Sequence, residues 1–555
     1  MAPKTSTMPS VPAELPEFAP SATADIASIV AGVRKEYNTL KTRDLEFRIT
    51  QLRKLYWAVD DYSDLLLKAL HKDLRMSSYE ATLCELNITK GLILDMLKGI
   101  RSYAADEKVP NLSLTTLPTR VRIRKEPLGV ALIISPYNFP LQLAIAPAVG
   151  AIAAGCAFVL KPSEASPATS AVLTHMFASR LDSSLYTVVN GEVPETTVLL
   201  DQKWDKIFYT GGSAVAKIIC KKAAETLTPV ALELGGLNPA FITPSANVAS
   251  AARRLLWAKS LNCGQVCVSQ NYALVDRQLV PEFIAALKKE YDVMFPQGAK
   301  ASPDLSRIIN ARHFARIKGY LDQTGGTVVL GGNTDESELF IEPTVVLVEN
   351  EQDVLIQNET FGPVWSIMSV DSTDEAIAIA NRVCSTPLGM YPFGDQAETE
   401  KILAHVTSGG VTINDGFMHG TIEALPFGGV GQSGTGASHG SAGFYEFTHR
   451  RSVLANPSWT ERLFRVRYMP YLTPNLAKAA YIQPAPDFDR DARELRGLTY
   501  WAKLVLGLGG AASATGVLAR LLVAAAAVYV AVNTRARPET WWDVVNRNMP
   551  ALLRR

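Results

Sequence analysis

The sequence predicts an α/β protein built on an open parallel sheet, followed by a second α/β unit. Short apolar runs such as LGVALII at 128–134 alternate with longer segments of helical spacing, as in strands that helices cover on both faces. Polar or glycine-bearing turns follow these runs, as they do in doubly wound sheets. The chain has 555 residues, which is too long for one ordinary core and indicates two or more domains.

The first hundred residues precede the sheet. Residues 1–22 contain five prolines among Ser, Thr and Ala, and this composition predicts a disordered extension. Apolar residues at helical spacing then indicate helices within 26–40, 44–74 and 78–103. We expect these helices to be scaffold and assign them no chemistry.

After Pro110 the hydrophobic period changes from that of a helix to that of a strand. TRVRIRK at 119–125 alternates polar and apolar residues, as a half-solvated strand or hairpin arm does. A helix of small residues is expected at 141–155. The buried strands of the parallel sheet are expected at 128–134, 157–160, 186–189, 206–209 and 230–234.

Four polar or glycine-bearing turns fall at the carboxyl ends of these strands, at 135–138, 161–164, 210–213 and 233–236. Ligands of open parallel sheets bind at this edge. One such turn is usually plain loop geometry, but four at equivalent strand ends predict a shared site.

A second α/β unit is expected from about residue 238, since strand-like runs and helices alternate again. Its strands are expected at 240–243, 272–275, 327–330, 344–348 and 364–370. Residues 409–414 and the glycine-rich segment 426–436 follow.

The segment KSLNCGQVCVSQ at 259–270 presents Cys263 and Cys267 at the end of a helix-like run. A cysteine in a chain of this size is most often a small buried apolar residue. A metal site would need more ligands, and neither a CxxC pair nor a nearby histidine supplies them. We therefore predict no metal.

Composition and charge limit the class of protein. The net charge of +1 argues against a broad nucleic-acid surface. Six cysteines are too sparse for a disulfide framework and fit a reducing compartment. The first residues do not form a charged region followed by an apolar run, so no secretory signal is visible.

Seven short motifs follow one another along the chain. They are PYNFP at 136–140, LKPSE at 160–164, FYTG at 208–211, LELGG at 232–236, GQVC at 264–267, ETFGP at 359–363 and PFGGVG at 426–431. With these motifs in this order, the chain resembles the aldehyde dehydrogenase superfamily, most closely its class 3, fatty-aldehyde branch. The resemblance covers about residues 25–450. The family usually has Gly where this chain has Ala216, and Lys where it has Leu237.

The resemblance implies a catalytic set of Cys267, Glu233 and Asn138. Cys267 matches the family nucleophile, which attacks an aldehyde to give a thiohemiacetal and then a thioester. The Asn138 amide and the Cys267 backbone N–H match the donors that hold the oxyanion. Glu233 matches the general base for thioester hydrolysis, and partial desolvation would raise its pKa toward a useful range. Cys263 is expected to be a packing thiol.

The resemblance also implies NAD as cofactor, with NADP as an alternative. Lys161 and Glu164 resemble the pair that holds the adenine-side ribose, and a carboxylate there favours NAD because it would repel a 2′-phosphate. Class 3 enzymes often accept both. Gly211 and Ser213 precede a helix whose N-terminus suits a phosphate. Glu359 and Phe361 resemble the residues that hold the nicotinamide ribose and ring.

The C-terminal part suggests a membrane anchor. Residues 504–532 contain a single charged residue, Arg520. A spanning helix needs about 20 mostly apolar residues, whereas 521–532 would extend only about 18 Å. A span must therefore include Arg520 or end near it. The alternatives are a helix or hairpin in one leaflet and a soluble helix packed on the core or on a partner. Class 3 fatty-aldehyde enzymes resemble the anchored case.

We therefore predict an aldehyde dehydrogenase-like α/β fold and NAD(P)-dependent oxidation of medium- or long-chain aliphatic aldehydes. A homodimer is expected, with strands at 110–126 and near 409–414 in an oligomerisation extension. The catalytic part should be cytosolic, on a membrane that we leave open among endoplasmic reticulum, lipid droplet and outer mitochondrial membrane. The alternative functions are a thioester or ester hydrolase and a non-catalytic membrane scaffold.

The predicted domain boundaries follow from these assignments. They are a disordered extension at 1–22, a dinucleotide-binding domain at 23–236, a catalytic domain at 237–413, a return to the cofactor and oligomerisation region at 414–450, a connecting segment at 451–503, the anchor at 504–533 and a tail at 534–555.

Overall fold

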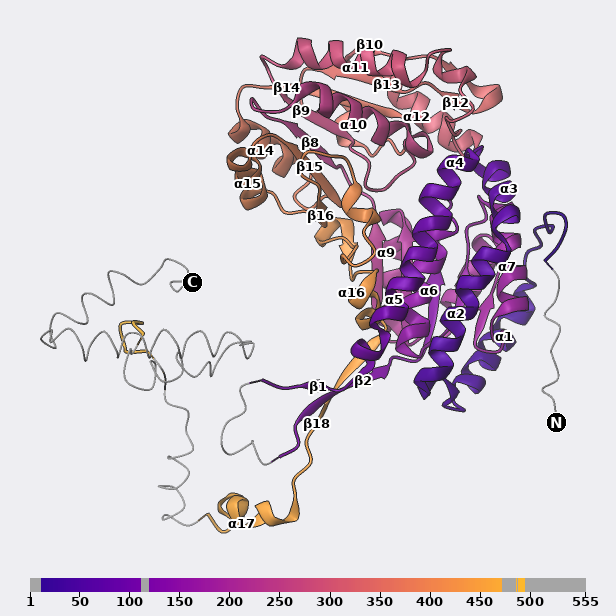
Figure 1. Ribbon diagram of the computed structural model, residues 1–555, viewed down its shortest axis with the longest axis vertical. Helices are drawn as coiled ribbons and strands as arrows, with labels where there is room; N and C mark the ends of the chain where they lie inside the picture. The colour runs from indigo at the N-terminus through magenta and orange to yellow at the C-terminus, as the bar shows by residue number, and fades with distance from the viewer. Residues whose placement is uncertain (1–10, 111–118, 472–485, 487, 495–555) are drawn as a thin grey trace, which may run out of the picture. The chain divides into compact units, whose positions relative to one another are not determined.

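The computed structural model describes residues 11–110, 119–471, 486 and 488–494. The chain divides into two compact units. The first contains the residues up to 106 and residues 124–451, and the second contains 107–123 and the residues from 452 onward. Both large sheets and all the residues of the candidate site belong to the first unit (Figure 1).

A six-stranded sheet in the order β17-β7-β6-β3-β4-β5 organises the amino-terminal half of this unit. Strands β3 to β7 are parallel, and β17 pairs antiparallel with β7. The strands are β3 Val130–Ile134, β4 Ala157–Lys161, β5 Tyr186–Val188, β6 Lys206–Gly211, β7 Val230–Leu234 and β17 Gly434–Thr435. All five predicted runs are strands, and β3 and β4 are buried at every residue, which explains their continuous apolar sequence.

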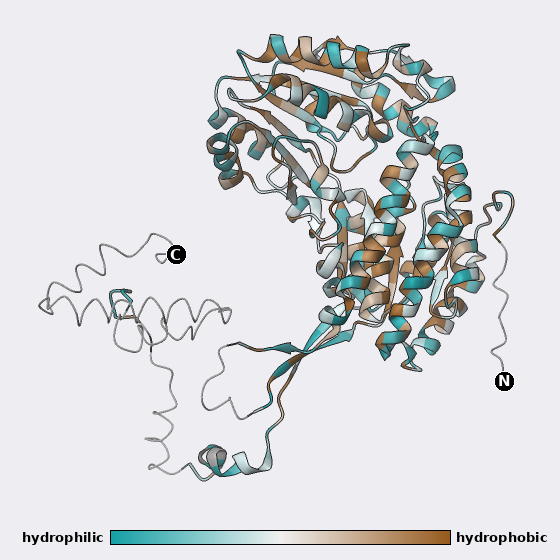
Figure 2. Cartoon of the chain, in the orientation of Figure 1, coloured by the Kyte–Doolittle hydropathy of each residue, from teal (hydrophilic) through white to brown (hydrophobic). Residues whose placement is uncertain are grey.

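Helices cover this sheet. Figure 1 shows α2, α5 and α6 side by side, and they contact one another. α6 packs against β3 and β4 as well as against α5 and α16. It is therefore apolar all round (Figure 2). The helices are α1 Thr23–Tyr37, α2 Leu45–Asp61, α3 Ser63–Leu74, α4 Ser78–Glu80, α5 Ile88–Ala104, α6 Gln142–Ala154, α7 Pro167–Arg180, α8 Val193–Leu200, α9 Ser213–Glu225 and α16 Gly440–Glu446.

Two of the predicted helical regions are divided in the structure. The region 44–74 breaks at Tyr62, whose buried hydroxyl bonds to His175 Nδ1 at 2.7 Å and Ser179 Oγ at 2.8 Å. The region 78–103 contains a π-helical turn, η2 Ala81–Asn87, between α4 and α5. Helical spacing of apolar residues continues through both irregularities, so it could not reveal them.

A seven-stranded sheet in the order β10-β13-β14-β9-β8-β15-β16 organises the second half of the unit. Its strands are β8 Pro239–Ile242, β9 Tyr272–Asp276, β10 Thr327–Leu330, β13 Thr344–Val348, β14 Val364–Val370, β15 Gly389–Phe393 and β16 Gly410–Val411. The five strands predicted here are confirmed. β15 was missed because Gly389 and Pro392 lie within it, and proline usually excludes a run from the inside of a sheet.

The remaining elements of this half are short or lie on the surface of the second sheet. The helices are α10 Val248–Ser260, α11 Val280–Met294, α12 Ala311–Gln323, α13 Val354–Gln357, α14 Thr373–Val383 and α15 Gln396–His405. A two-stranded sheet pairs β11 Thr334–Asp335 with β12 Phe340–Ile341. The 3₁₀ turns over the whole described chain are η1 Lys41–Arg43, η3 Leu261–Gly264, η4 Ala299–Ala301, η5 Glu336–Glu338, η6 Met418–Thr421, η7 Gly431–Ser433, η8 Ser458–Thr460 and η9 Arg465–Arg467.

A three-stranded sheet joins β1 Glu107–Lys108, β2 Arg122–Pro127 and β18 Thr448–Val453 in the order β1-β2-β18. The strand predicted at 119–125 is therefore present as β2. The prediction that a strand near 409–414 belongs to the same extension is wrong, because β16 pairs with β15 in the seven-stranded sheet. A short helix, α17 Glu461–Phe464, follows β18.

The two ends of the chain are described only in part. Within the predicted N-terminal extension, Val11 and Leu15 pack against the first core and the Ser21 N–H donates to the Asn190 carbonyl, so this part contacts the fold. The predicted anchor at 504–533 and the tail lie outside the described residues. Within the residues that the structure describes, every helix is too short or too polar to cross a membrane.

Candidate active site

The strand-end turns of the six-stranded sheet open into one cavity of about 590 Å³. Each turn contributes to its lining, with Asn138, Lys161, Gly211 and Glu233 among the residues. The four turns therefore meet at one cavity, which lies at the carboxyl ends of the parallel strands as predicted. The second half of the unit adds Cys267, His313, Arg316, Glu359 and Phe361 to the lining.

Cys267 follows a tight loop at the end of α10. In this loop Asn262 and Cys263 have left-handed backbone angles, with φ of 48° and 52°, a conformation that costs non-glycine residues energy. The Cys267 side chain is half-buried and lines the cavity. Cys263 is fully buried within the core of the second half, as expected of a packing thiol.

The electrostatic surroundings of Cys267 keep its thiol protonated. Burial raises the pKa of the thiol to about 12, and the charges of Glu233 and Glu359 contribute to the increase. The Cys267 carbonyl accepts a hydrogen bond from Asn238 Nδ2 at 2.8 Å, which fixes the backbone at this position. A thiol with this pKa must lose its proton to another group before it can act as a nucleophile.

Gly264 brings the Cys267 loop against the chain that follows Phe361. Its φ is 68°, and a Cβ at this position would lie 2.2 Å from the Gly362 carbonyl oxygen. Only glycine combines this left-handed backbone with so close an approach. The two loops that carry Cys267 and Phe361 are therefore held together by backbone contact.

Asn138 is buried beside the same loop. Its Nδ2 donates to the Gln265 carbonyl at 3.0 Å, and its own carbonyl accepts from Asn262 Nδ2 at 2.6 Å. An amide nitrogen carries two hydrogens, so one remains for a ligand oxygen. The structure thus brings Asn138 and Cys267 together, as predicted.

Glu233 lies at the end of β7, almost wholly buried, and also lines the cavity. Burial raises the pKa of its carboxyl to about 7, and the Glu446 charge adds to the increase. The Ser438 hydroxyl donates to Glu233 Oε1 at 2.7 Å, and this hydrogen bond lowers the pKa of the carboxyl. Ser438 was missed by sequence reasoning, because a serine in a glycine-rich segment carries no signal for a contact 205 residues away.

Lys161 and Glu164 form an ion pair of 2.7 Å at the cavity wall, with the lysine buried. Burial works against the charge of Glu164, but the Lys161 ammonium outweighs it and holds the pKa of Glu164 below its usual value. Gly211 lines the cavity at the end of β6. Ser213, the first residue of α9, is exposed and is not among the lining residues.

Glu359 and Phe361 line the cavity from the loop between α13 and β14. Burial raises the pKa of Glu359 to about 7, and Phe361 has a left-handed backbone with φ of 45°. Sequence reasoning missed the two basic residues that fix this loop. Arg316 donates to the carbonyls of Glu359 and Thr360 at 3.1 and 3.0 Å, and buried Lys259 donates to Thr360 Oγ1 at 3.2 Å.

The two departures from the family pattern lie outside the cavity lining. Ala216 lies on α9 with its side chain buried in the first core, so its extra methyl group is at a helix–sheet contact. Leu237 packs against the core of the second half. Neither change alters a group that faces the cavity.

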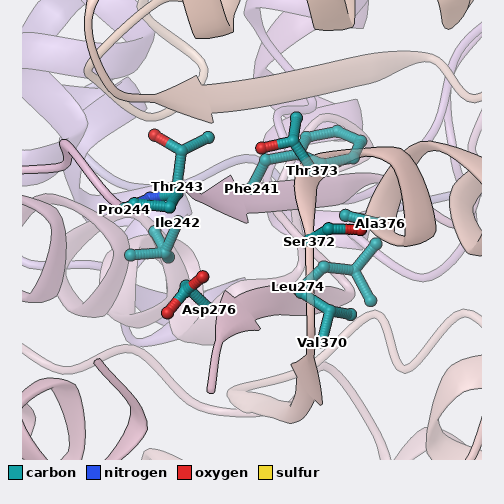
Figure 3. Close-up of a pocket in the computed structure, with 10 residues that line it drawn as sticks. All are labelled: Phe241, Ile242, Thr243, Pro244, Leu274, Asp276, Val370, Ser372, Thr373 and Ala376. Carbon is teal, nitrogen blue, oxygen red and sulfur yellow. The ribbon is translucent and has the colours of Figure 1, made fainter. Parts of the chain in front are cut away.

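A second hollow is much smaller and lies at the ends of β8, β9 and β14 (Figure 3). Its volume is about 10 Å³, room for one water molecule at most. Among the described residues that line it, Asp276 alone carries a charge. It is too small to hold a ligand.

Comparison with known proteins identifies relatives over most of the chain. A model of the aldehyde dehydrogenase family matches residues 4–453. The beta-apo-4'-carotenal oxygenase of Neurospora crassa is 51% identical over 92% of this chain and 96% of that protein. Aldehyde dehydrogenase family 3 member B1 of Rattus norvegicus is 40% identical over 80% of this chain and 94% of that protein. The substrate-bound structure of Staphylococcus aureus AldH has a TM-score of 0.79 and 35% identity, and covers 82% of this chain and 99% of that one.

The cavity has the groups that a dinucleotide requires. Lys161 can donate a hydrogen bond to a ribose hydroxyl, and the Glu164 carboxylate can accept one from it. The apolar side chains of Val193, Val215 and Ile218 line the same cavity and suit a planar base. A Cβ at Gly212, the residue before α9, would meet nothing within 4 Å, so the N-terminus of this helix is open to a phosphate.

The Gly264–Gly362 contact predicts that an added methyl group destabilises the protein at Gly264 and not at a glycine with space around it. Gly264→Ala should lower the free energy of unfolding by about 2–4 kcal/mol, because it adds an overpacked contact and left-handed strain. Gly319→Ala is the matched control, since it lies within α12 and its Cβ would meet nothing nearer than 3.8 Å; it should be neutral or stabilising by up to about 1 kcal/mol. Chemical unfolding of both variants measures the difference, and equal stability would contradict the contact.

Proposed function

This chain belongs to the aldehyde dehydrogenase family, within its class 3 branch, and from this premise we propose that Cys267, Glu233 and Asn138 carry out the oxidation. It is an NAD(P)-dependent aldehyde dehydrogenase. The observation that supports these roles is the meeting of a thiol, a buried carboxyl and an amide donor, from three separated parts of the chain, at one cavity.

The first half of the reaction makes the aldehyde carbon tetrahedral. The Cys267 thiol gives its proton to one of the two carboxylates beside it, Glu233 or Glu359. The sulfur then attacks the carbonyl carbon, so a C–S bond forms, the C=O π bond breaks and the negative charge moves to oxygen. Asn138 Nδ2 and the Cys267 backbone N–H donate to that oxyanion. Bound NAD(P), which Lys161, Glu164 and Glu359 would hold, supplies the hydride acceptor that this two-electron oxidation requires.

The second half of the reaction releases the acid. A thioester on Cys267 remains after the oxidation, and water must attack its carbonyl carbon. Glu233 takes the proton from that water, for which a pKa of about 7 is well matched to neutral pH. The C–S bond then breaks, the carboxylic acid leaves, and Cys267 is restored.

The proposed substrate is an aldehyde on a long apolar chain. The resemblance to the fatty-aldehyde branch supports a medium- or long-chain aliphatic aldehyde. The Neurospora crassa relative is named for a carotenal, which is also an aldehyde at the end of a long apolar chain. We therefore propose that chain length and apolar character, more than saturation, define the substrate class.

Turnover measurements test the function and the nucleophile together. Wild-type protein should reduce NAD with decanal or hexadecanal, and kcat/KM should increase from propanal upward. Cys267→Ala should lower kcat about 1,000-fold or more while NAD still binds. Cys220→Ala, which removes a half-buried thiol on α9, is the control and should change kcat by roughly twofold at most.

Three results would oppose the proposal. A kcat/KM that peaks at short aldehydes would contradict the substrate class. Equal activity in Cys267→Ala and wild type would contradict the nucleophile. If only an apocarotenal is oxidised and every linear aldehyde is inert, the aliphatic part of the proposal fails.

The Ser438 hydrogen bond predicts a shift in the pH profile. Glu233 acts as a base only when ionised, so kcat should increase as the pH passes about 7. Ser438→Ala removes a bond to the charged carboxylate and should raise the pKa of Glu233, which moves this increase about one pH unit higher. Thr435→Ala, an exposed change in neighbouring β17, should leave the profile in place. A Ser438→Ala profile that superimposes on wild type would refute the assignment.

We also propose that the full chain is a homodimer associated with a membrane, with its catalytic part in the cytosol. The nearly uncharged segment 504–532 supports the membrane. β18 supports the dimer, since it is the outer strand of its sheet among the described strands and most of its side chains are exposed. The full chain should float with lipid vesicles, a chain ending at 503 should not, and light scattering should give the mass of two chains. Equal flotation of both chains, or a monomer mass, would contradict these proposals.

A further inference from the structure

Two buried carboxylates have no part in the chemistry proposed above. Glu80 ends α4 and Glu85 lies within the π-helical turn η2. Both are buried, and neither lines the cavity. In the part of the chain that the structure describes, neither forms an ion pair with a basic residue. Burial raises the pKa of Glu80 to about 7 and that of Glu85 to about 8, so their positions are costly and call for an explanation.

Glu85 fixes the start of the helix that follows Asn138. Its two carboxyl oxygens accept from the backbone N–H groups of Leu141 at 3.3 Å and Gln142 at 2.6 Å. Leu141, the residue before α6, offers no side-chain cap of its own. Glu85 therefore supplies from another helix the acceptor that the first N–H groups of α6 need.

Glu80 fixes the loop that precedes Cys267. One of its oxygens accepts from the Asn262 backbone N–H at 2.7 Å, at the point where the chain adopts its left-handed conformation. The Asn262 side chain in turn donates to the Asn138 carbonyl at 2.6 Å. The two carboxylates thus hold two segments that are also bonded to each other.

The π turn explains how one short segment reaches both. In an α-helix, residues five apart differ by about 140° around the axis, so Glu80 and Glu85 would face different directions. The i→i+5 bonds of a π turn bring such residues close to the same side. π turns occur often at functional sites, and this one turns both carboxylates toward the Asn138 and Cys267 segments.

We propose that Glu80 and Glu85 are positioning residues that set the separation between the Asn138 amide and the Cys267 backbone N–H, the two donors to the oxyanion. This proposal rests on the proposed function of those donors. It assigns a purpose to the π turn and to the burial of both carboxylates. Neither carboxylate touches the substrate, and each acts through the backbone that it holds.

Glutamine variants test the proposal, since each keeps the size of the side chain and replaces one acceptor oxygen by a donor. Glu80→Gln and Glu85→Gln should each lower kcat at least tenfold, while the dissociation constant of NAD changes less than twofold. Glu290→Gln is the control, because Glu290 is also little exposed but lies on α11, outside the Asn138 and Cys267 segments, and pairs with Arg253. It should leave kcat unchanged.

A double-mutant cycle separates positioning from general stability. If Glu80 acts through the oxyanion donors, Glu80→Gln should cost less than threefold in kcat when Asn138→Ala is already present. Losses that multiply in the double variant, or a loss of NAD binding equal to the loss of kcat, would overturn the proposal. So would full activity in both glutamine variants.

A measurement independent of turnover keeps this test separate from the proposed function. Iodoacetamide should alkylate Cys267 at least threefold faster in Glu80→Gln than in wild type, because the loop that precedes the thiol loses the hydrogen bond from Asn262 to Glu80. Glu290→Gln should react at the wild-type rate. Unchanged alkylation in Glu80→Gln would overturn the positioning role even if the wild-type protein oxidised no aldehyde, whereas wild-type inactivity with faster alkylation would count against the proposed function alone.

Discussion

The removal of water from one thiol and two carboxyls is the constraint on which the site depends. Cys267, Glu233 and Glu359 share a cavity and are each shifted toward their neutral forms by burial. A buried carboxyl with a pKa near 7 can take and release protons at neutral pH. Three charges in so small a volume would repel one another, so burial also limits how many are ionised together. Burial therefore keeps the Cys267 thiol protonated and also raises the pKa of Glu233 to the range of a general base.

This arrangement requires loops from both large sheets to meet at the cavity. The six-stranded sheet contributes its strand ends, and the chain between α10 and β9 contributes Cys267. Left-handed angles at Asn262 and the bare backbone of Gly264 allow that chain to approach Gly362. Such strain persists only where surrounding contacts determine the conformation. Glu80 and the Asn138 carbonyl supply those contacts by accepting hydrogen bonds from Asn262. Lys259 and Arg316 supply others by donating to Thr360 in the Glu359 loop.

The sequence alone predicted most of the sheets and the place of the site. Continuous apolar runs revealed β3 to β7, and the turns after them revealed where their ends would meet. It could not reveal β15, whose Pro392 and Gly389 oppose a strand assignment while the surrounding sheet overrides them. It could not reveal Ser438, Arg316 or Glu80 either, because each acts through hydrogen bonds with residues far away in the chain. Ser213, chosen for its place at a helix start, is exposed and stands apart from the lining.

The central claim is that Cys267 is the nucleophile and that Glu233 is the base for thioester hydrolysis. The mass of the protein after reaction tests this claim most directly. Glu233→Gln, mixed with NAD and a long-chain aldehyde, should form the thioester and fail to hydrolyse it. Mass spectrometry should then find the acyl group on the peptide that contains Cys267, and the adduct should be absent from Cys267→Ala. An unmodified Glu233→Gln protein that still turns over, or an acyl group on another residue such as Cys263, would contradict the account.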